Sequence, residues 1–387
     1  MPGTTFSSTE MIHRLVRFDT TSRQSNLALI DFVRDYLDGW GVDSELVFDA
    51  ERKKANLYAT IGPDDKGGVM LSGHTDVVPV DGQPWDTDPF AVVEADGRLY
   101  GRGTCDMKSF IAVALALVPD FLAGKLATPI HLALSYDEEV GCIGVRDLIA
   151  GLRQRPVRPR ACIVGEPTEM KPVIAHKGRK MVRCEVHGHE AHSALAHEGV
   201  NAVEAAAELI AYLKVMARRK REQGPFDPGF NPPYTTIHTC IVEGGTALNI
   251  VPRYCRFDFE FRNIPEDDLE VLLAEVKRHA ESVLLPEMRS VSDEAGINFD
   301  VRNTTVGLSA SPDEEIVRIA QSFSGANALG KVSYGTEAGL FKAAEIPTVI
   351  CGPGSMAQGH KPNEFIALEQ VQRCEDFMRR LMDHLRR

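Results

Sequence analysis

At residues 135–141 the chain reads Ser-Tyr-Asp-Glu-Glu-Val-Gly, directly after the apolar run Ile-His-Leu-Ala-Leu at residues 130–134. The apolar run predicts a buried strand, so three acidic residues stand where a strand ends. Carboxylates about 4 Å apart repel each other by roughly 4 kcal/mol at an effective dielectric constant near 20, which favours a bound cation or proton. Taken alone, the acidic turn could instead open the following helix, because a helix N-terminus favours negative charge.

Further residues offer metal ligands at comparable places, namely His74, Asp106, Glu166 and His360. His74 and Glu166 each close an apolar run, at the strand ends where open α/β sheets place their ligands. His360 lies in a loop rich in glycine and proline, which is unsuited to a core histidine. Asp76 could orient the imidazole of His74, whereas Asp106 alone would also fit a helix N-cap. Together with the acidic turn, these groups suit two divalent ions that share one carboxylate, with one acid left as a general base.

The composition is that of an ordinary globular protein. Its 387 residues, 43% of them hydrophobic, predict two domains. The net charge of −12 argues against nucleic-acid binding, and the basic run at 218–221 is interpreted as the solvated end of a helix. No leader opens the chain and the longest apolar stretch, 110–119, is too short to cross a bilayer, so we expect a cytoplasmic protein without a membrane partner. Eight cysteines without a Cys-x-x-Cys pair are typical of reduced thiols.

The first part of the chain alternates between strand and helix signals, which predicts an α/β fold with a mostly parallel sheet covered by helices on both faces. Ser7 and Glu10 form a capping-box pattern ahead of a first helix, and Asp96-Gly97 marks a hairpin. The expected strands cover 43–48, 56–61, 69–72, 90–93, 99–100, 130–136 and 161–165. The next expected helices cover 29–40, 106–122 and 143–152.

Beyond residue 178 the pattern changes to strands of alternating polarity. The order β-α-β-β-α-β predicts a ferredoxin-like antiparallel sheet with one exposed face. Its expected strands cover 181–186, 234–242, 254–262 and 297–301, and its expected helices cover 200–219 and 266–285. A buried strand at 348–351 then returns to the first pattern. We therefore predict a catalytic domain of residues 1–179 and 305–387, interrupted by an inserted lid and dimerisation domain of residues 180–304.

Five motifs together resemble the M20 family of dinuclear zinc aminoacylases and peptidases, in the order that this family shows. The motifs are His74-x-Asp76, Gly101-x-Gly103-x-x-Asp106-Met107-Lys108, Asp137-Glu138-Glu139-x-Gly141, Gly165-Glu166-Pro167-Thr168 and the late His360. The match spans the whole chain. Segments 334–341 and 351–365 are most similar to the acetylornithine deacetylase branch of the family. The resemblance therefore implies removal of the acetyl group from N2-acetyl-L-ornithine, a step of arginine biosynthesis.

The resemblance also implies roles for single residues. Asp106 would bridge two divalent ions, expected to be zinc, although His and carboxylate ligands also accept cobalt or manganese. The other ligands would be His74 and Glu166 at one metal site, and Glu139 and His360 at the other. Glu138 would be the general base, and Asp76 would orient His74. A non-proline cis peptide bond is implied after Asp106.

Further implied roles fall in the inserted domain, through which the chain is expected to form a homodimer. His192, in the motif Gly188-x-x-Ala191-His192-Ser193, matches a histidine that stabilises the oxyanion and in dimeric members reaches the partner's active site. Asn249 and Arg262 match residues that hold the substrate carboxylate. Glu337, in the late part of the chain, is a candidate for binding the positively charged end of a side chain such as that of ornithine.

Three alternatives stay open. Another substrate within the same family is possible, such as a different N-acyl amino acid, a dipeptide or succinyl-diaminopimelate. A protein of another class, a metal-binding scaffold without activity, is disfavoured because every ligand and base position is filled. A separate metal site is disfavoured because no Cys or Asp lies at ligand spacing among the four histidines concerned. These are His187, His189, His192 and His197.

Overall fold

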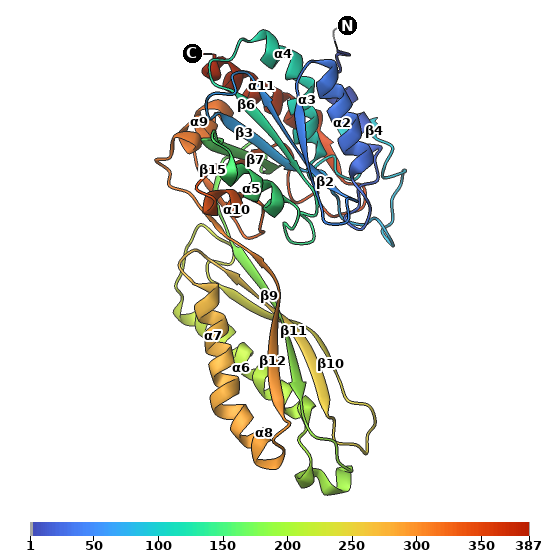
Figure 1. Ribbon diagram of the computed structural model, residues 1–387, viewed down its shortest axis with the longest axis vertical. Coiled ribbons are helices and arrows are strands. Elements are labelled where there is room, and N and C mark those ends of the chain that lie inside the picture. The colour runs from blue at the N-terminus through green and yellow to red at the C-terminus, as the bar shows by residue number, and fades with distance from the viewer. Residues whose placement is uncertain (1–2, 387) are drawn as a thin grey trace. The chain divides into compact units, whose positions relative to one another are not determined.

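The computed structural model describes residues 3–386, and the chain divides into two compact units (Figure 1). Unit 1 contains Met1–Ala175, Leu308–Lys331 and Thr336–Arg387, and unit 2 contains His176–Gly307 and Val332–Gly335. Each unit has a hydrophobic core of its own. Unit 2 therefore interrupts the chain of unit 1.

Unit 1 is built on a nine-stranded sheet of order β1-β2-β6-β3-β7-β15-β8-β13, with β14 paired to β8. The central strands β6, β3, β7 and β15 are parallel neighbours and every residue in them is buried, as continuous apolar strands of a covered sheet require. Antiparallel pairs flank them. The strands are β1 Ser44–Phe48, β2 Ala55–Ile61, β3 Val69–His74, β6 Ile130–Ser135, β7 Ala161–Pro167, β8 Val173–His176, β13 Leu308–Ser309, β14 Gly330–Val332 and β15 Thr348–Gly352. The predicted mostly parallel sheet is confirmed.

Helices cover both faces of this sheet (Figure 1). On one face α3 contacts β3 and β7, and α1 and α11 pack against α3; on the other, α5 and α10 pack together over β2, β7 and β15. The helices of this unit are α1 Ser8–Val16, α2 Leu27–Gly39, α3 Lys108–Ala116, α4 Val118–Ala123, α5 Val145–Gln154, α9 Glu315–Ser324, α10 Ala338–Ala343 and α11 Leu368–Leu385. The helix layers leave the carboxyl ends of the central strands to be covered by loops.

The capping box and the hairpin turn that the sequence predicts are both confirmed. Ser7 Oγ accepts the N–H of Glu10, and the Glu10 carboxylate accepts the N–H of Ser7, so the capping box is complete. Asp96 and Gly97 both have positive φ, 50° and 69°, as a two-residue hairpin turn requires. The first strand of this hairpin begins at Val93, later than we expected.

The prediction of one helix over 106–122 is wrong. The segment forms two helices, α3 and α4, that meet at Leu117. Pro119 lies in the first turn of α4, where its missing N–H costs nothing, but it cannot continue the hydrogen bonds of α3. The first helix also begins later, at Lys108, so Asp106 is not its N-cap.

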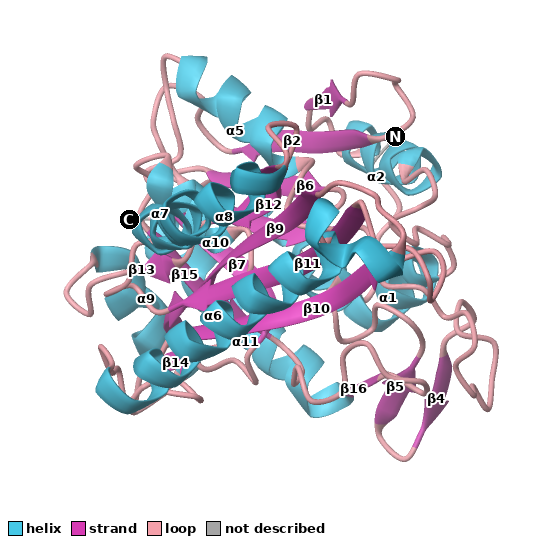
Figure 2. Cartoon of the chain, turned by 90° about the horizontal axis from the view of Figure 1, so that it is seen from below, coloured by secondary structure: helices cyan, strands magenta, loops and turns pink. Residues whose placement is uncertain are grey.

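A small three-stranded sheet joins distant parts of unit 1 (Figure 2). Its order is β16-β5-β4, in which β4 is Val93–Ala95, β5 is Arg98–Tyr100 and β16 is Phe365–Ala367. The antiparallel pairing of β16 with β5 places the segment after His360 beside the turn that leads to Asp106. This pairing brings two loops of the candidate site together.

Unit 2 is built on a four-stranded sheet of order β10-β11-β9-β12, in which all neighbouring strands are antiparallel. Its elements are β9 Gly178–His187, α6 Ala202–Gln223, β10 Thr236–Gly244, β11 Tyr254–Asn263, α7 Leu269–His279, a π-helical turn Ala280–Leu284, α8 Leu285–Val291 and β12 Gly296–Thr305. Alternate residues of β9 are buried, so one sheet face packs on the helices. Element order and strand order are those of a ferredoxin-like sheet. Among residues 3–386, no helix has the length and apolar character to span a bilayer.

Candidate metal centre

The candidate ligands of unit 1 converge where neighbouring strands end. His74 is the last residue of β3, Glu166 lies near the end of β7, and Glu138 and Glu139 follow β6. Because β3 lies between β6 and β7 in the sheet, the three strand ends are adjacent. Carboxyl ends of parallel strands are where open α/β sheets bind ligands.

Two loops supply the other candidates. Asp106 lies just before α3 without capping it, and its peptide bond to Met107 is cis, as the resemblance implied. His360 lies between β15 and β16 with a positive φ of 62°, and half of its side chain is exposed. The structure therefore brings all five predicted metal ligands to one place.

Asp106 divides these ligands into two sets. Its Oδ1 lies 3.1 Å from Nε2 of His74, whereas its Oδ2 lies 3.2 Å from Nε2 of His360. Glu166 Oε1 lies 3.8 Å from the same nitrogen of His74. Glu139 Oε2 lies 3.0 Å from Nε2 of His360. Each oxygen of Asp106 thus faces one histidine, and each of these histidines faces one further acid.

The cluster concentrates acidic groups in a buried place. Burial raises the pKa of Glu166 well above its usual range, and the neighbouring Asp106 raises it further. Burial and Asp106 likewise raise the pKa of Glu139 to about 7. Hydrogen bonds to Asp106 and Glu139 raise the pKa of His360 to about 10. Without a metal ion, protons held by these acidic groups and by His360 offset the negative charge of the cluster. A bound metal ion could balance the same charge instead.

The donor set fits divalent metal ions. Imidazole nitrogens and carboxylate oxygens bind zinc at about 2.0–2.2 Å, so two such ligands around a tetrahedral ion lie about 3.4 Å apart. The four contacts of Asp106 and its neighbours span 3.0 to 3.8 Å. The ligand atoms of His74, Asp106 and Glu139 also lie within 4.8 Å of one another, as do those of His74, Glu138 and Glu166. Glu138 is therefore near enough to be a ligand, although the two oxygens of Asp106 define both sets without it.

Asp76 supports both sides of the cluster. Nδ1 of His74 donates to the backbone oxygen of Asp76 at 2.9 Å, and the Asp76 carboxylate lies 3.6 Å from the same nitrogen. The carboxylate accepts the backbone N–H groups of Glu138 and Glu139 at 3.1 and 3.3 Å. The hydroxyl of Ser22 donates at 2.7 Å to Oδ2, the oxygen that also accepts from Glu139. Asp76 thus orients the histidine mainly through its backbone, while its carboxylate holds the acidic turn.

Glu337 lies in the interior of unit 1, where we did not expect a substrate-binding residue. Its side chain is 1% exposed, and burial raises its pKa to about 7. The buried hydroxyls of Ser135 and Ser72 face this carboxylate and lower its pKa, but burial outweighs them. A substrate's ammonium group would have to enter the interior to meet this carboxylate.

Two candidates of unit 2 are neighbours. His192 is exposed and precedes a short 3-10 helix, where its Nδ1 accepts the N–H of Ala194 at 3.1 Å. The N–H of Ser193 donates to the carbonyl of Asn249 at 3.0 Å. The loop motif of His192 and the segment of Asn249 therefore lie side by side within this unit.

The third candidate of unit 2, Arg262, forms an ion pair. Its Nε donates to Oε1 of Glu260 at 2.8 Å, and Arg179 holds the other oxygen of Glu260 at 2.6 Å. Within residues 3–386, Nε is the one nitrogen of the Arg262 guanidinium with a hydrogen-bond partner. The terminal nitrogens are thus available to a carboxylate.

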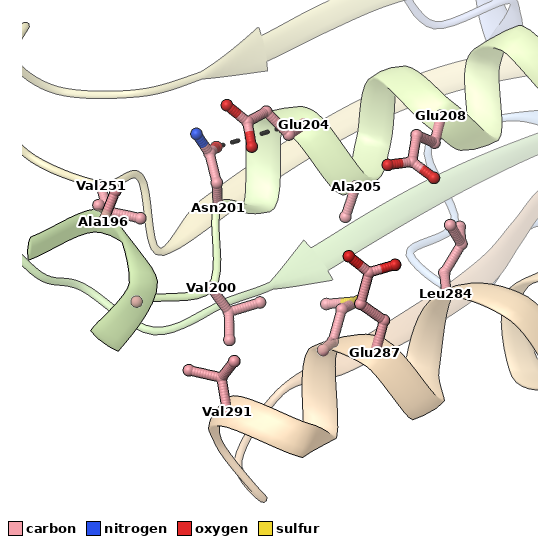
Figure 3. Close-up of a pocket in the computed structure, with 12 residues that line it drawn as sticks. Ala196, Val200, Asn201, Glu204, Ala205, Glu208, Val251, Leu284, Glu287 and Val291 are labelled. Carbon is pink, nitrogen blue, oxygen red and sulfur yellow. Dashed lines mark hydrogen bonds between the residues drawn. The ribbon is translucent and has the colours of Figure 1, made fainter. Parts of the chain in front are cut away.

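Unit 2 also contains a cavity of about 190 Å³ between α6 and α8 (Figure 3). Its walls are polar and apolar in about equal parts, and the carboxylates of Glu208 and Glu287 point toward the same space. Glu204 donates its N–H to Asn201, which caps α6. All three glutamates are exposed and the lining residues include no histidine, so the cavity lacks the imidazole ligands of the cluster in unit 1.

The four histidines at 187–197 are not among the ligand groups that lie close enough to share an ion in the part of the chain that the structure describes. The ring of His187 packs against Tyr254 with centroids 5.3 Å apart, and His197 lies 3.9 Å from Glu198. Among the described residues, the groups of ligand atoms close enough to share an ion come from unit 1.

Comparison with known proteins gives consistent matches along the chain. The model of peptidase family M20/M25/M40 matches residues 70–384. An acetylornithine deacetylase of Myxococcus xanthus is 37% identical over 380 residues, which cover 96% of this chain and 95% of that protein. An acetylornithine deacetylase of Pasteurella multocida strain Pm70 is 31% identical over 360 residues, covering 93% and 91%. An M20 family metallo-carboxypeptidase of Sulfolobus solfataricus has a similar fold, with a TM-score of 0.75 at 17% identity over 98% of this chain and 99% of that one.

Proposed function

Because this chain belongs to peptidase family M20/M25/M40 and is a metal-dependent hydrolase, we propose that it removes the acetyl group from N2-acetyl-L-ornithine with two divalent ions. The products are ornithine and acetate, in a step of arginine biosynthesis. Similarity over nearly the full length of acetylornithine deacetylases supports this substrate. The eight cysteines are free in the structure, which fits the reducing cytoplasm where we expect the enzyme to act.

The position of Asp106 carries the proposal of a dinuclear centre. Its two oxygens face different histidines, at 3.1 and 3.2 Å, as a carboxylate shared between two ions must. His74 and Glu166 would hold one ion, and Glu139 and His360 the other. Ions bound there would lower the pKa of water and polarise the acyl carbonyl, with zinc, cobalt or manganese as candidates.

Glu138 is proposed as the general base. Burial and the nearby Glu139 and Glu337 raise its pKa well above the usual range, although His74 opposes them. A carboxyl group with a raised pKa can accept a proton from the attacking water and return it to the leaving amine. Cys142, whose Sγ lies 3.4 Å from Glu138 Oε1, donates a weak hydrogen bond that limits the movement of this side chain.

His192 is proposed as the donor that stabilises the oxyanion. Because its Nδ1 accepts an N–H, the proton of the neutral ring lies on Nε2. An Nε2–H group can donate to the oxygen on which negative charge develops. Arg262 and Asn249 are proposed to hold the substrate α-carboxylate. Unit 2 is proposed to mediate a homodimer, and the mixing experiment described below decides whether the histidine acts in its own subunit or in the partner.

A panel of substrates tests this proposal. Metal-reconstituted protein should hydrolyse N2-acetylornithine with a higher kcat/KM than other N-acetyl amino acids, succinyl-diaminopimelate or dipeptides. The matched control is Glu138→Gln, which should be inactive on every substrate. A preference for another member of the panel would replace the substrate but keep the family, whereas no hydrolysis by metal-loaded protein would contradict the proposed function.

A further inference from the structure

The buried carboxylate of Glu364 holds the turn that carries Asp106. Its Oε1 accepts three backbone N–H groups, from Gly103 at 3.0 Å, Cys105 at 2.8 Å and Asp106 at 3.0 Å. Converging N–H groups form an anion-binding concavity of the backbone, here filled by a side chain from 258 residues along the chain. The backbone position of Asp106 is therefore fixed by Glu364.

The other oxygen of Glu364 connects this turn to the loop of His360. Oε2 lies 2.6 Å from Nη1 of Arg102, whose side chain is 1% exposed. Nη2 of Arg102 donates to Gln83 at 2.6 Å, and the amide of Gln83 donates to the backbone oxygen of His360 at 3.0 Å. A chain of charged and polar contacts thus runs from the amide of Asp106 to the backbone of His360.

His360 needs such support more than His74, the histidine of the other proposed metal site. His74 is the last residue of a buried strand, whereas His360 lies in a loop with positive φ and a half-exposed side chain. Groups behind the metal ligands commonly fix ligand orientation, and their loss typically costs 10–100-fold in metal affinity.

We propose that Glu364, acting with Arg102 and Gln83, is a positioning residue that pre-arranges the metal site of Asp106 and His360. This inference rests on the proposed dinuclear function, because it concerns the affinity for one of the two ions. The site of His74 depends less on the network, since two of its ligands stand at strand ends. A merely structural ion pair would change stability without separating the two binding steps.

The test is a titration of metal-free protein with cobalt(II), in which calorimetry and visible absorption measure each binding step. In Glu364→Gln, one of the two binding steps should weaken by about 10–100-fold. Gln83→Ala removes the link to His360 and the acceptor of Arg102 Nη2 and Trp85 Nε1, but keeps the contacts of Glu364. In this variant the same step should weaken by about 10-fold, and excess cobalt should restore kcat. Gln372→Ala, an exposed glutamine on α11, is the matched control and should leave both steps unchanged.

The outcomes separate this inference from the proposed function. A wild-type protein that binds fewer than two ions contradicts the dinuclear proposal itself. Two unchanged binding steps in folded Glu364→Gln, or equal weakening of both steps, would overturn the positioning role. If Glu364→Gln does not fold because Arg102 loses its partner, Gln83→Ala alone decides, and an unchanged titration then rejects the inference.

Discussion

Oδ1 of Asp76 lies 3.1 Å from the backbone nitrogen of Glu138, so a residue that follows strand β3 holds the turn that follows strand β6. The backbone oxygen of the same residue accepts a hydrogen bond from His74 at 2.9 Å. A single residue therefore sets the positions of a proposed metal ligand and of the proposed base.

Replacing Asp76 with Ala should weaken metal binding by about 10–100-fold, because the acidic turn loses the carboxylate that holds it and His74 loses the carboxylate 3.6 Å from its Nδ1, although the backbone oxygen remains. It should also lower kcat at saturating metal, since Glu138 is no longer held. Competition with a chelator measures the affinity, and Asp65→Ala, an exposed aspartate in a loop, serves as the control. Unchanged affinity together with unchanged kcat would remove Asp76 from the supporting network.

Glu138→Gln should retain both metal ions and lose at least about 10²-fold in turnover, because an amide cannot accept the proton from water. Elemental analysis of the purified variant measures the retained metal. The ligand atom of Glu138 lies within 4.8 Å of those of His74 and Glu166, so the result is informative. Loss of one ion would show that Glu138 is a ligand and not the base.

Glu139→Ala and His360→Ala should each weaken the same single metal site, because Glu139 Oε2 lies 3.0 Å from Nε2 of His360, the nitrogen that also faces Oδ2 of Asp106. Calorimetric titration of metal into each variant measures the two binding steps separately. Glu166→Ala is the matched comparison and should weaken the other step. Variants of Glu139 and His360 that affect different steps would contradict the proposed pairing.

His192→Ala should keep both metal ions and lower kcat by roughly 10²-fold or more, the usual effect of one lost oxyanion donor. KM and metal content are measured alongside kcat. If the histidine acts across a dimer, mixing this variant with Glu138→Gln should restore activity, since one site then receives both intact residues. No recovery after proven subunit exchange would place His192 in its own subunit, and a full kcat would exclude it from the mechanism.

Glu337→Gln should stabilise the metal-free protein at high pH. An unfolded glutamate ionises near pH 4.3, but burial raises the pKa of Glu337 to about 7, so the folded state retains the proton longer. The resulting destabilisation grows between these two values and is constant above about pH 7. Thermal unfolding should therefore show a gain of at most about 4 kcal/mol at pH 8 that disappears near pH 4.

The matched control for that measurement is Glu94→Gln, an exposed glutamate of β4, which should show no such pH dependence. If Glu337→Gln raises the KM for acetylornithine but leaves the KM for an uncharged acetyl amino acid unchanged, the result would instead support a role in substrate binding. A pH-independent stability difference would indicate that the carboxyl group is ionised in the folded protein.

Sequence patterns predicted the fold wherever the local signal and the tertiary structure agree. The continuous apolar run of β6 and the alternating residues of β9 gave the correct type of sheet because burial sets both patterns. The run 106–122 misled because its apolar character continues through Pro119, whereas the backbone hydrogen bonds do not. Periodicity reports burial and does not report a break in a buried helix.

The candidate site was predictable to the same degree. The ligands carry recognisable motifs, and the structure brings all five together. Glu364 escaped notice because its partners are backbone N–H groups, which leave no mark in a sequence. The burial of Glu337 escaped notice because a single acidic residue before a short helix reads as exposed.

The interrupted chain of unit 1 has a consequence for biosynthesis. Polypeptides are made from the N-terminus, and domains generally fold as units during synthesis. When the ribosome has reached residue 307, the nascent chain contains His74, Asp106 and Glu166 but not His360. A ribosome stalled at that point would present every proposed ligand of one ion but lack His360 of the other, so the order of translation sets the order in which the two metal sites can be completed.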